Sequence, residues 1–312
     1  MTMPVLEVEG LSISFTQYDK GVRQRSLPVI RDLDLTIRPG QVVAVVGSSG
    51  SGKSLLAHGI LGILPYNARQ SGSIRYRGEP LTPRRAEELR GREIVLIPQS
   101  VGYLDPLMQV GPQIRKGRRD PASRARSREI LGRYHLGSEV EALYPFELSG
   151  GMTRRVLIST AVAEAPSLVI ADEPTPGLDP RSLHHIMDHF REIADSGAGL
   201  LLITHDLEAA LAIADRVAVF YAGETIEEAP ASDFAAEETL RHPYTRALWR
   251  AMPQHGFQPI PGAQPYPGAA PQGCPFLPRC PRRTAECGSA VPYRPVEGGF
   301  VRCLHPERGA EA

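Results

Sequence analysis

The residues best suited to chemistry form one glycine-rich run, Gly47-Ser48-Ser49-Gly50-Ser51-Gly52-Lys53-Ser54. Its spacing fits G-x-x-x-x-G-K-[ST], a pattern in which the glycines let backbone N–H groups wrap around phosphates. We expect Lys53 to reach the β- and γ-phosphates and Ser54 to ligate Mg²⁺. The run follows an apolar strand and opens a helix, whose N-terminus also favours anions. The run therefore predicts a nucleoside triphosphate site.

Two further polar groups follow apolar segments that are typical of strands. Asp172 and Glu173 come directly after residues 167–171, where Asp172 suits the Mg²⁺ shell and Glu173 suits a general base. Adjacent acids after a strand also serve as simple loop solvation. His205 ends the next such segment and could contact the γ-phosphate. A lone histidine at a strand end is more often structural, so the sequence leaves its role open.

All four cysteines lie within 30 residues near the C-terminus: Cys274, Cys280, Cys287 and Cys303. In a reducing compartment, clustered cysteines indicate metal rather than disulfides. Structural zinc sites usually carry paired C-x2-4-C knuckles, which this C-x5-C-x6-C-x15-C spacing lacks. Four thiolates from an irregular loop favour an iron–sulfur cluster, with zinc and metal-free thiols as alternatives. His305 is a possible substitute ligand or a surface residue.

The elements that must position these groups alternate along the chain. Apolar runs predict strands buried on both faces, and periodic segments between them predict helices. The pattern indicates an α/β fold with a mostly parallel sheet. The expected strands are Val42–Val46, Ile94–Pro98, Leu168–Ala171, Leu200–Thr204 and Val217–Tyr221, and the expected helices are Lys53–Leu64, Gly151–Ala165 and one from Pro180 to Gly197.

Composition excludes several classes of protein. The 312 residues carry 35 basic and 35 acidic side chains, so no global positive charge points to nucleic acid, and none is expected as a partner. No apolar run approaches the roughly 20 residues that cross a bilayer. The first ten residues lack a signal peptide, which predicts a cytosolic protein. Of the 29 prolines, 12 fall between Pro253 and Pro306, so we expect a loop-rich segment after about residue 250.

One stretch of the chain is strongly basic. Between Arg115 and Arg133 there are eight basic residues against two acids, and Gly117 and Pro121 interrupt any helix before residues 129–134. An anion-binding patch for nucleic acid or lipid headgroups is one interpretation. A solvated arginine-rich surface is the other, and it is favoured because no aromatic residues are interleaved for base stacking.

The run Leu148-Ser149-Gly150-Gly151-Met152, between the glycine-rich run and Asp172, brings a family into view. These motifs, in this order along the chain, resemble those of the nucleotide-binding subunit of an ABC transporter. The resemblance implies the P-loop NTPase core of an ABC ATPase, with ATP and Mg²⁺ as cofactors. It also assigns roles: Gly47–Ser54 as Walker A, Gln99 as Q-loop, residues 148–152 as signature, Asp172 as Walker B acid, Glu173 as catalytic glutamate, Asp179 as D-loop acid, His205 as switch histidine, Phe15 (or next Tyr18) as adenine-stacking ring, and Ser54, Gln99 and Asp172 as the Mg²⁺ shell.

The C-terminal side narrows the resemblance. Residues 242–248 and 273–280, with Tyr144–Glu147 before the signature, are similar to the oligopeptide, dipeptide and nickel importer ATPases. This implies an ATPase domain over residues 1–240 with a small helical subdomain at about 100–150, and an irregular Pro- and Cys-rich extension over 241–312. It further implies that the four cysteines hold a [4Fe–4S] cluster.

The same resemblance implies partners and a location. They are a second ATP-binding subunit, identical or not, two membrane permease subunits and an extracytoplasmic substrate-binding protein, with this chain peripheral on the cytoplasmic face of the inner membrane. The signature would act on the γ-phosphate bound by the partner subunit. The expected function is ATP-driven import of peptides or of nickel and other metal chelates, and the sequence does not name the cargo.

Two departures and three alternatives accompany this interpretation. Met152 stands where glutamine is commoner, and Pro176-Gly177-Leu178-Asp179 differs from the usual Ser-Ala-Leu-Asp. A soluble ABC ATPase of DNA repair or translation would usually carry coiled-coil insertions or two fused halves, which are absent here. A P-loop kinase would lack the signature. A non-catalytic scaffold would not need Glu173 and His205.

Overall fold

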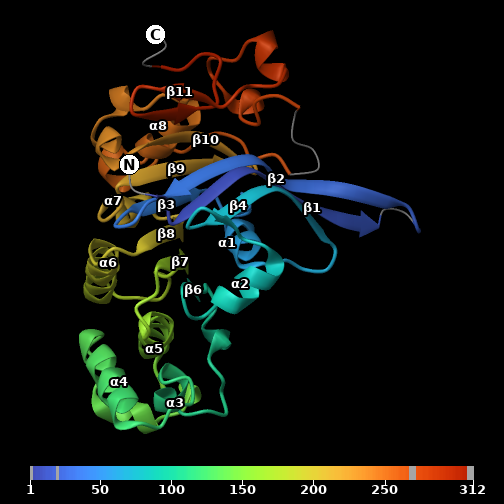
Figure 1. Cartoon of the computed structure of the whole chain (residues 1–312). Coiled ribbons are helices and arrows are strands. Elements are labelled where there is room, and N and C mark those ends of the chain that lie inside the picture. Colours follow the sequence, from blue (N-terminus) through green and yellow to red (C-terminus); the bar gives the residue numbers. More distant parts are fainter. Residues whose placement is uncertain (1–2, 19–20, 267–271, 308–312) are drawn as a thin grey trace.

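Two sheets organise the computed structural model, which describes residues 3–18, 21–266 and 272–307 (Figure 1). The larger sheet has eight strands in the order β11-β12-β10-β9-β3-β8-β7-β6. The five strands from β9 to β6 run parallel, whereas β10, β12 and β11 are antiparallel additions at one edge. Their bounds are β3 Val42–Gly47, β6 Ile94–Ile97, β7 Leu168–Asp172, β8 Gly199–Thr204, β9 Arg216–Tyr221, β10 Glu224–Pro230, β11 Arg294–Val296 and β12 Gly299–Val301.

The parallel strands confirm all five strands expected from the apolar runs, with ends that differ by one residue at most. Every residue of β3, β7 and β8 is buried. Alternate residues serve two separate cores, since Val43 and Val45 face one cluster and Val42, Ala44 and Val46 face the other. Burial on both faces is the reason why these strands read as continuous apolar runs.

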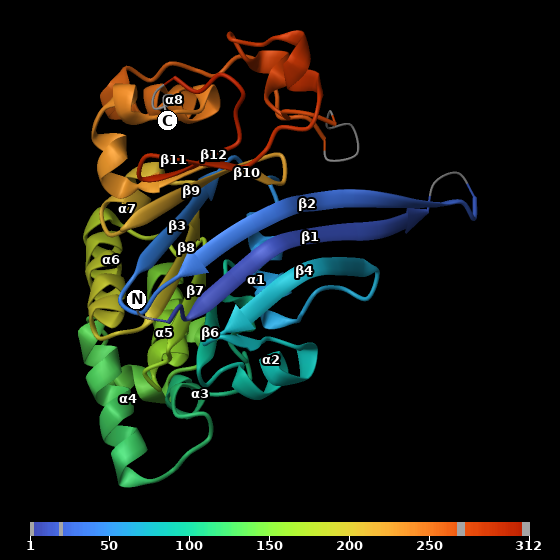
Figure 2. The same ribbon diagram turned by 45° about the horizontal axis from the view of Figure 1, so that its top comes forward.

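The second sheet is antiparallel and has the order β2-β1-β4-β5. In Figure 2 its long strands cross in front of the parallel sheet, with α1 behind them. Over part of their length these strands alternate buried with partly exposed residues, a weaker signal than an apolar run, and they were not expected from the sequence. Their bounds are β1 Leu6–Tyr18, β2 Gln24–Ile37, β4 Ala68–Tyr76 and β5 Glu79–Pro80.

The helices flank the parallel sheet and form one end of the molecule. α1 ends at Leu61, three residues before the expected end, because Gly62 adopts a left-handed conformation with φ of 64°. The expected interruption at Pro121 is wrong, since Pro121 occupies the first turn of α4 and Asp120 caps it by accepting from the amide of Ser123. The bounds are α1 Lys53–Leu61, α2 Pro83–Leu89, α3 Val110–Ile114, α4 Pro121–Arg133, α5 Gly150–Val162, α6 Pro180–Asp195, α7 Leu207–Leu211 and α8 Pro243–Arg250.

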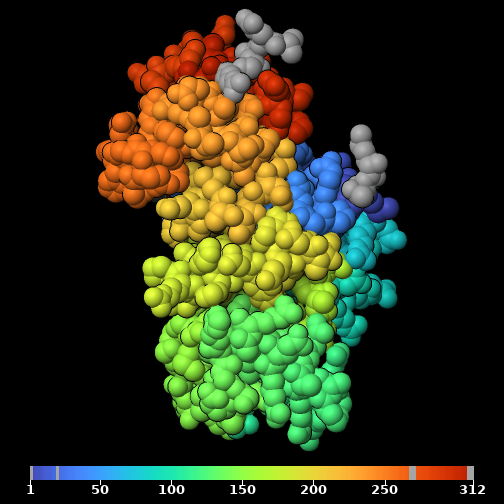
Figure 3. Space-filling view, turned by 90° about the vertical axis from the view of Figure 1, so that its left-hand side faces the viewer, coloured from blue at the N-terminus to red at the C-terminus, as the bar shows by residue number. Residues whose placement is uncertain are grey.

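Helices α3, α4 and α5 lie at one end of the molecule, and the C-terminal residues lie at the opposite end (Figures 1 and 3). Several basic residues of the stretch 115–133 form ion pairs with acids of the same region. Arg115 and Arg128 contact Glu141, while Lys116 and Arg118 contact Glu164. These pairs favour the interpretation of a solvated, internally balanced surface.

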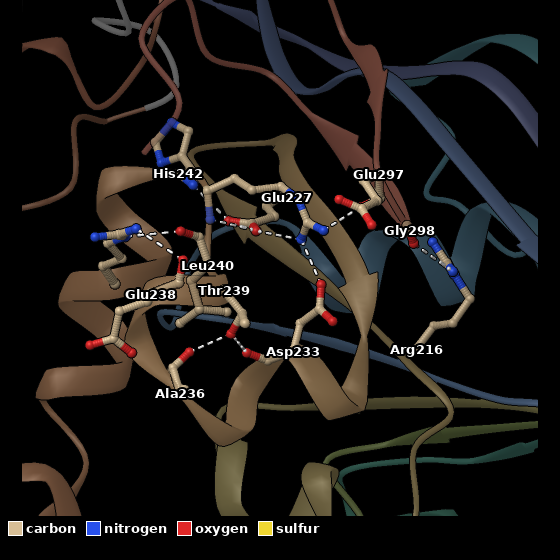
Figure 4. A network of polar contacts seen from close by, with 12 residues as sticks. Arg216, Glu227, Asp233, Ala236, Glu238, Thr239, Leu240, His242, Glu297 and Gly298 are labelled. Atoms are coloured by element: carbon tan, nitrogen blue, oxygen red, sulfur yellow. Dashed lines mark hydrogen bonds and ion pairs between the residues drawn. The ribbon is translucent and has the colours of Figure 1, made fainter. Parts of the chain in front are cut away.

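The C-terminal extension is joined to the sheet through a buried carboxylate. Glu227 of β10 is fully buried and accepts hydrogen bonds from the backbone amides of Arg241 and His242, at 2.9 and 2.8 Å. The Arg241 guanidinium pairs with Asp233 and donates to the Glu297 carbonyl before β12 (Figure 4). Apart from β11, β12 and two short 3-10 helices (Leu277–Arg279 and Ala285–Gly288), the described residues 256–266 and 272–307 are irregular, as expected from their proline content.

Candidate functional site

The glycine-rich run turns tightly where β3 ends. A Cβ atom at Gly47 would collide with the carbonyl oxygen of Phe220, so the chain can pass β9 at this point only with a glycine. Gly50 and Gly52 adopt positive φ of 77° and 98°, and Gly52 is the N-cap of α1. The backbone therefore has the loop-then-helix form that binds phosphate.

Lys53 joins two residues of the loop through its ammonium group. Its Nζ donates to the carbonyl oxygens of Gly47 at 2.8 Å and Ser48 at 3.1 Å. Burial lowers the pKa of Lys53 below its ordinary value, while the nearby carboxylates of Glu173 and Asp172 act in the opposite direction. The positive charge of the ammonium group thus lies at the loop, close to the carboxylates of two acids.

Two of the three residues expected to hold Mg²⁺, Ser54 and Asp172, are in direct contact. The Ser54 hydroxyl donates to Oδ1 of Asp172 at 3.1 Å, although 118 residues separate them in the sequence. Burial raises the pKa of Asp172, and the hydrogen bond from Ser54 opposes that shift. A hydroxyl beside a partly desolvated carboxylate is an oxygen donor set that suits Mg²⁺.

Glu173 and His205 form a second polar pair. His205 Nδ1 lies 2.8 Å from Oε2 of Glu173, and the Glu173 amide donates to the Ile203 carbonyl at 2.8 Å. Glu173 has φ of 49°, a left-handed conformation that non-glycine residues rarely adopt. Such strain persists where the surrounding structure imposes it and is frequent at functional sites.

A cleft of about 420 Å³ opens beside these residues. Gln99, which follows β6, reaches it together with Lys53, Ser54, Glu173 and His205. The full lining is Val29, Ser49, Gly50, Gly52, Lys53, Ser54, Leu55, Gln99, Glu173 and His205. The structure thus brings into one cleft eight residues that were expected from the sequence to serve ATP and its metal, namely these five together with Ser49, Gly50 and Gly52.

The aromatic residue expected to stack on adenine lies outside this lining. Phe15 is half-buried in β1 and packs against the core beneath the antiparallel sheet. Tyr18, the second choice, is exposed, and its hydroxyl accepts a hydrogen bond from Gln24 at 3.2 Å. Neither ring lines the described cleft, so adenine stacking stays a prediction.

Arg154 is a site-related residue that sequence reasoning missed. It is buried on α5, and its guanidinium donates to the carbonyls of Pro98 at 2.9 Å and Gln99 at 2.6 Å. These bonds tie the Gln99 segment to the helix that follows the signature. The only sequence signal was a charged residue on an otherwise apolar helix face, which does not identify a partner 55 residues away.

The signature residues form the open N-terminus of α5. Ser149 is the N-cap and accepts from the Met152 amide at 3.3 Å, while Gly150 and Gly151 face open space. Leu148 packs against the core. None of residues 148–152 lines the cleft described above. The amides at this helix start are therefore available to an anion from outside this cleft.

Asp179 caps the next helix in this structure. Its carboxylate accepts from the amides of Arg181 and Ser182 at 3.1 Å each and from the Ser182 hydroxyl at 2.6 Å. These hydrogen bonds lower the pKa of Asp179. A role in contact between two subunits, expected from the sequence, stays a prediction.

The four cysteines surround a second, smaller cavity. We call residues 272–307, which carry all four, the cysteine module. Each thiol is buried and free of disulfides, and the cavity is lined by all four together with His242 and His305 among others. Burial raises the pKa of Cys274 to about 12 and that of Cys303 to about 11. Four desolvated thiols around one cavity form an unusual donor set.

His242 contributes an unsatisfied polar atom to that cavity. Its Nδ1 accepts from the Tyr244 amide at 3.0 Å, so the proton sits on Nε2, which is buried and has no partner among the described residues. Burial lowers the pKa of His242 to about 3, so the ring is neutral. Within residues 3–18, 21–266 and 272–307, however, no group of three or more His, Cys, Asp or Glu is arranged to hold a metal ion.

Comparisons with known proteins agree with this geometry. The family model described as "ABC transporter" matches residues 30–176, and that described as "Oligopeptide/dipeptide transporter, C-terminal region" matches residues 226–287. The chain is 35% identical to the oligopeptide transport ATP-binding protein OppD of Salmonella typhimurium, over 97% of this chain and 94% of that protein. It is 37% identical to OppD of Mycobacterium tuberculosis, over 93% of this chain and 49% of that longer protein.

A solved structure shares the fold as well. The ATP-binding subunit of an ABC transporter superposes with a TM-score of 0.61 at 26% sequence identity. The superposition covers 74% of this chain and 91% of that subunit.

Proposed function

The chain belongs to the ATP-binding proteins of ABC transporters, and on that premise we propose that it hydrolyses ATP to drive peptide uptake by an ABC importer. The observation that carries the proposal is the cleft in which the glycine-rich run Gly47–Ser54, called the P-loop from here on, meets Glu173, His205 and Gln99. The C-terminal match over residues 226–287 and the names of the relatives support peptides as cargo. Nickel and other metal chelates are the second cargo class.

Within the cleft, each residue has a proposed task. The loop amides and Lys53 bind the β- and γ-phosphates, and Ser54 and Asp172 would hold Mg²⁺, which neutralises charge that develops on the phosphates. Glu173 orients and deprotonates the attacking water, and His205 fixes the Glu173 carboxylate through their 2.8 Å contact. Gln99, tied to α5 by Arg154, would report the state of the cleft to the helical region.

A second ATP-binding subunit is the first proposed partner. The open helix start at Ser149–Gly151 supplies anion-binding amides that this chain's own cleft does not use. In a dimer, each signature would meet the γ-phosphate held by the other subunit. ATP would then join the two subunits, and hydrolysis would let them separate.

Membrane permease subunits are the next proposed partners. Next to Gln99, four large apolar side chains are exposed: Val101, Tyr103, Leu107 and Met108. An exposed apolar group that follows the Q-loop supports a contact with another protein. No helix in the described part of the chain is long and apolar enough to span a bilayer. We place the chain at the cytoplasmic face of the inner membrane, with an extracytoplasmic binding protein that delivers the peptide.

A [4Fe–4S] cluster is the proposed occupant of the cysteine module. Four buried thiols line one cavity, and the unpartnered Nε2–H of His242 is a donor that a cluster sulfide could accept. The C-x5-C-x6-C-x15-C spacing lacks the paired knuckles of structural zinc sites, which favours a cluster over zinc. A cluster bound here would crosslink a segment with little core of its own. Anaerobic purification that yields colourless, iron-free protein would contradict it.

The test of the main proposal uses the assembled transporter. ATPase activity of this chain with its permease subunits, second ATPase and binding protein is measured while small peptides and, separately, nickel chelates are titrated. Stimulation by peptides is expected. Equal activity from the isolated chain, with no stimulation by either class, would favour a soluble ABC ATPase instead.

A further inference from the structure

The P-loop residue Ser48 is held from outside the nucleotide cleft. Its hydroxyl donates to Oε1 of Gln264 at 2.5 Å, although 216 residues separate the two. On its other side, the Ser48 carbonyl accepts from Lys53 at 3.1 Å. Ser48 does not line the cleft, whereas its neighbour Ser49 does. The Ser48 side chain is therefore bonded to the C-terminal extension and does not line the cleft.

Tyr244 is a second residue of the C-terminal extension beside Ser48. This tyrosine lies on α8 and is buried, and the neighbouring Ser48 side chain and backbone oppose the rise in the pKa of Tyr244 that burial causes. Its ring packs against Tyr221 and Phe276, with centroids 4.5 and 5.4 Å away. An aromatic cluster thus fixes the ring of Tyr244 beside Ser48.

Arg279 holds the segment that carries Gln264. Its guanidinium donates to the carbonyls of Pro261 at 2.7 Å and Ile260 at 3.0 Å, and to the Tyr221 hydroxyl at 3.0 Å. The planar fork of one arginine can fix several acceptors at once. We call residues 258–264 the strap. The Arg279 side chain therefore contacts both the strap and Tyr221 of the aromatic cluster.

Arg279 in turn belongs to the cysteine module. Both Phe276 and Arg279 lie between Cys274 and Cys280, whose thiols line the cysteine cavity. Side-chain contacts and the short chain segment from Pro261 to Gln264 therefore connect that cavity through Arg279 to Ser48, and a second branch runs through Phe276 to Tyr244, which lies beside Ser48.

We propose that Gln264 and Tyr244 are positioning residues for ATP binding, through which the cysteine module sets the conformation of the P-loop at Ser48. The inference rests on the proposed ATPase function of this cleft. It assigns to the C-terminal extension a direct part in nucleotide affinity. A loop held in its phosphate-binding form needs less ordering when ATP arrives, so ATP binds more tightly.

The first experiment compares Gln264→Ala with Gln258→Ala in the full chain. Gln258 is an exposed glutamine of the same strap whose side chain makes no hydrogen bond within the described residues. Affinity for a fluorescent N-methylanthraniloyl-ATP is measured first, and kcat and KM for ATP are then measured in the assembled transporter. Loss of one hydrogen bond is expected to raise Kd and KM about fivefold while kcat changes by less than about twofold. Gln258→Ala should match the wild type.

A double-mutant cycle separates positioning from general damage. Ser48→Ala and Gln264→Ala are combined; if the two residues act through their mutual bond, the double variant should bind ATP no worse than Ser48→Ala alone. Tyr244→Phe, which removes only the hydroxyl, should raise KM in the same direction. Thermal unfolding of each variant identifies any that fail to fold. The ATP affinities of the variants that do fold then decide whether Gln264 and Tyr244 position the loop.

The two possible failures are distinguishable. If the wild-type chain neither binds nor hydrolyses ATP, the proposed function is wrong. If the wild type does both, and Gln264→Ala and Tyr244→Phe have KM values equal to or lower than that of Gln258→Ala, the positioning role is wrong. Additive effects of Ser48→Ala and Gln264→Ala would also overturn it.

Discussion

The nucleotide cleft and the cysteine module both gather residues that are distant in the sequence, but they do so by different means. Around the cleft, the P-loop, Asp172, Glu173 and His205 lie at the ends of the parallel strands β3, β7 and β8 or directly after them. In the module, four cysteines lie on an irregular chain that is positioned by side-chain contacts such as those of Glu227 and Arg279.

The contrast shows why the residues of one site can be predicted from the sequence and why the other site depends more on individual side-chain contacts. Strands joined by backbone hydrogen bonds bring their carboxyl ends to one edge, so residues directly after apolar runs meet without dedicated side-chain contacts. A loop-built module has no such ladder, and each of its side-chain contacts carries more of its stability. Changes in the cleft should therefore impair chemistry, and changes around the module should impair folding.

Glu173→Gln tests the first half of this comparison and has the largest expected effect. Turnover should fall by about 10²–10⁴-fold because the general base is lost, while ATP binding and thermal stability stay near wild type. Steady-state ATPase activity and nucleotide affinity measure the two separately, with Glu192→Gln on the exposed face of α6 as control. Wild-type-like hydrolysis in Glu173→Gln would refute the proposed role.

Glu227→Ala tests the second half. The buried amides of Arg241 and His242 lose their acceptor and the Arg241 guanidinium loses one carboxylate, so unfolding free energy should fall by about 3 kcal/mol. Urea unfolding followed by the single tryptophan, Trp249 on α8, reports the loss. Glu238→Ala, an exposed acid nearby, should have little effect. A stable Glu227→Ala chain would end the idea that this carboxylate joins the extension to the sheet.

Arg154→Ala sharpens the comparison, because here a side chain, not a strand end, positions part of the cleft. Without it the carbonyls of Pro98 and Gln99 lose their donor, and kcat should fall about tenfold through misplacement of Gln99. Arg181→Ala, exposed on α6, is the matched control. If kcat is unchanged and only stability falls, Arg154 supports the fold and does not act on Gln99.

The smallest expected effect is a pH dependence that is confined to the metal-free module. Burial raises the pKa of Cys303 from 9.0 to about 11 and that of Cys274 to about 12. The folded chain therefore keeps protons that the unfolded chain releases, so unfolding free energy should decline as the pH rises from about 9 to about 11. Urea midpoints with chelator and reductant across that range measure it. A Cys274→Ser/Cys303→Ser chain should show a smaller decline, and an equal decline would refute the cause.

The sequence was most informative where a single local rule decides the outcome. All five parallel strands, β3, β6, β7, β8 and β9, were expected, since burial on both faces leaves an apolar run. Lys53, Ser54, Gln99, Glu173 and His205 were proposed for one site and line one cleft. Helix ends were less accurate: Pro121 was read as an interruption although it begins α4, because one residue type serves both purposes.

The sequence alone therefore determined which strands end in polar residues of the site, and it determined the family motifs. Both are encoded in residues that are neighbours along the chain. Only the tertiary structure decided that Arg154 bonds Gln99, that Glu227 receives residues 241–242, and that Gln264 reaches Ser48 across 216 positions. A long polar side chain carries no mark of its partner in its own sequence neighbourhood. Packing of the elements decides which buried donors and acceptors lie within about 3 Å of it, and one of these becomes its partner.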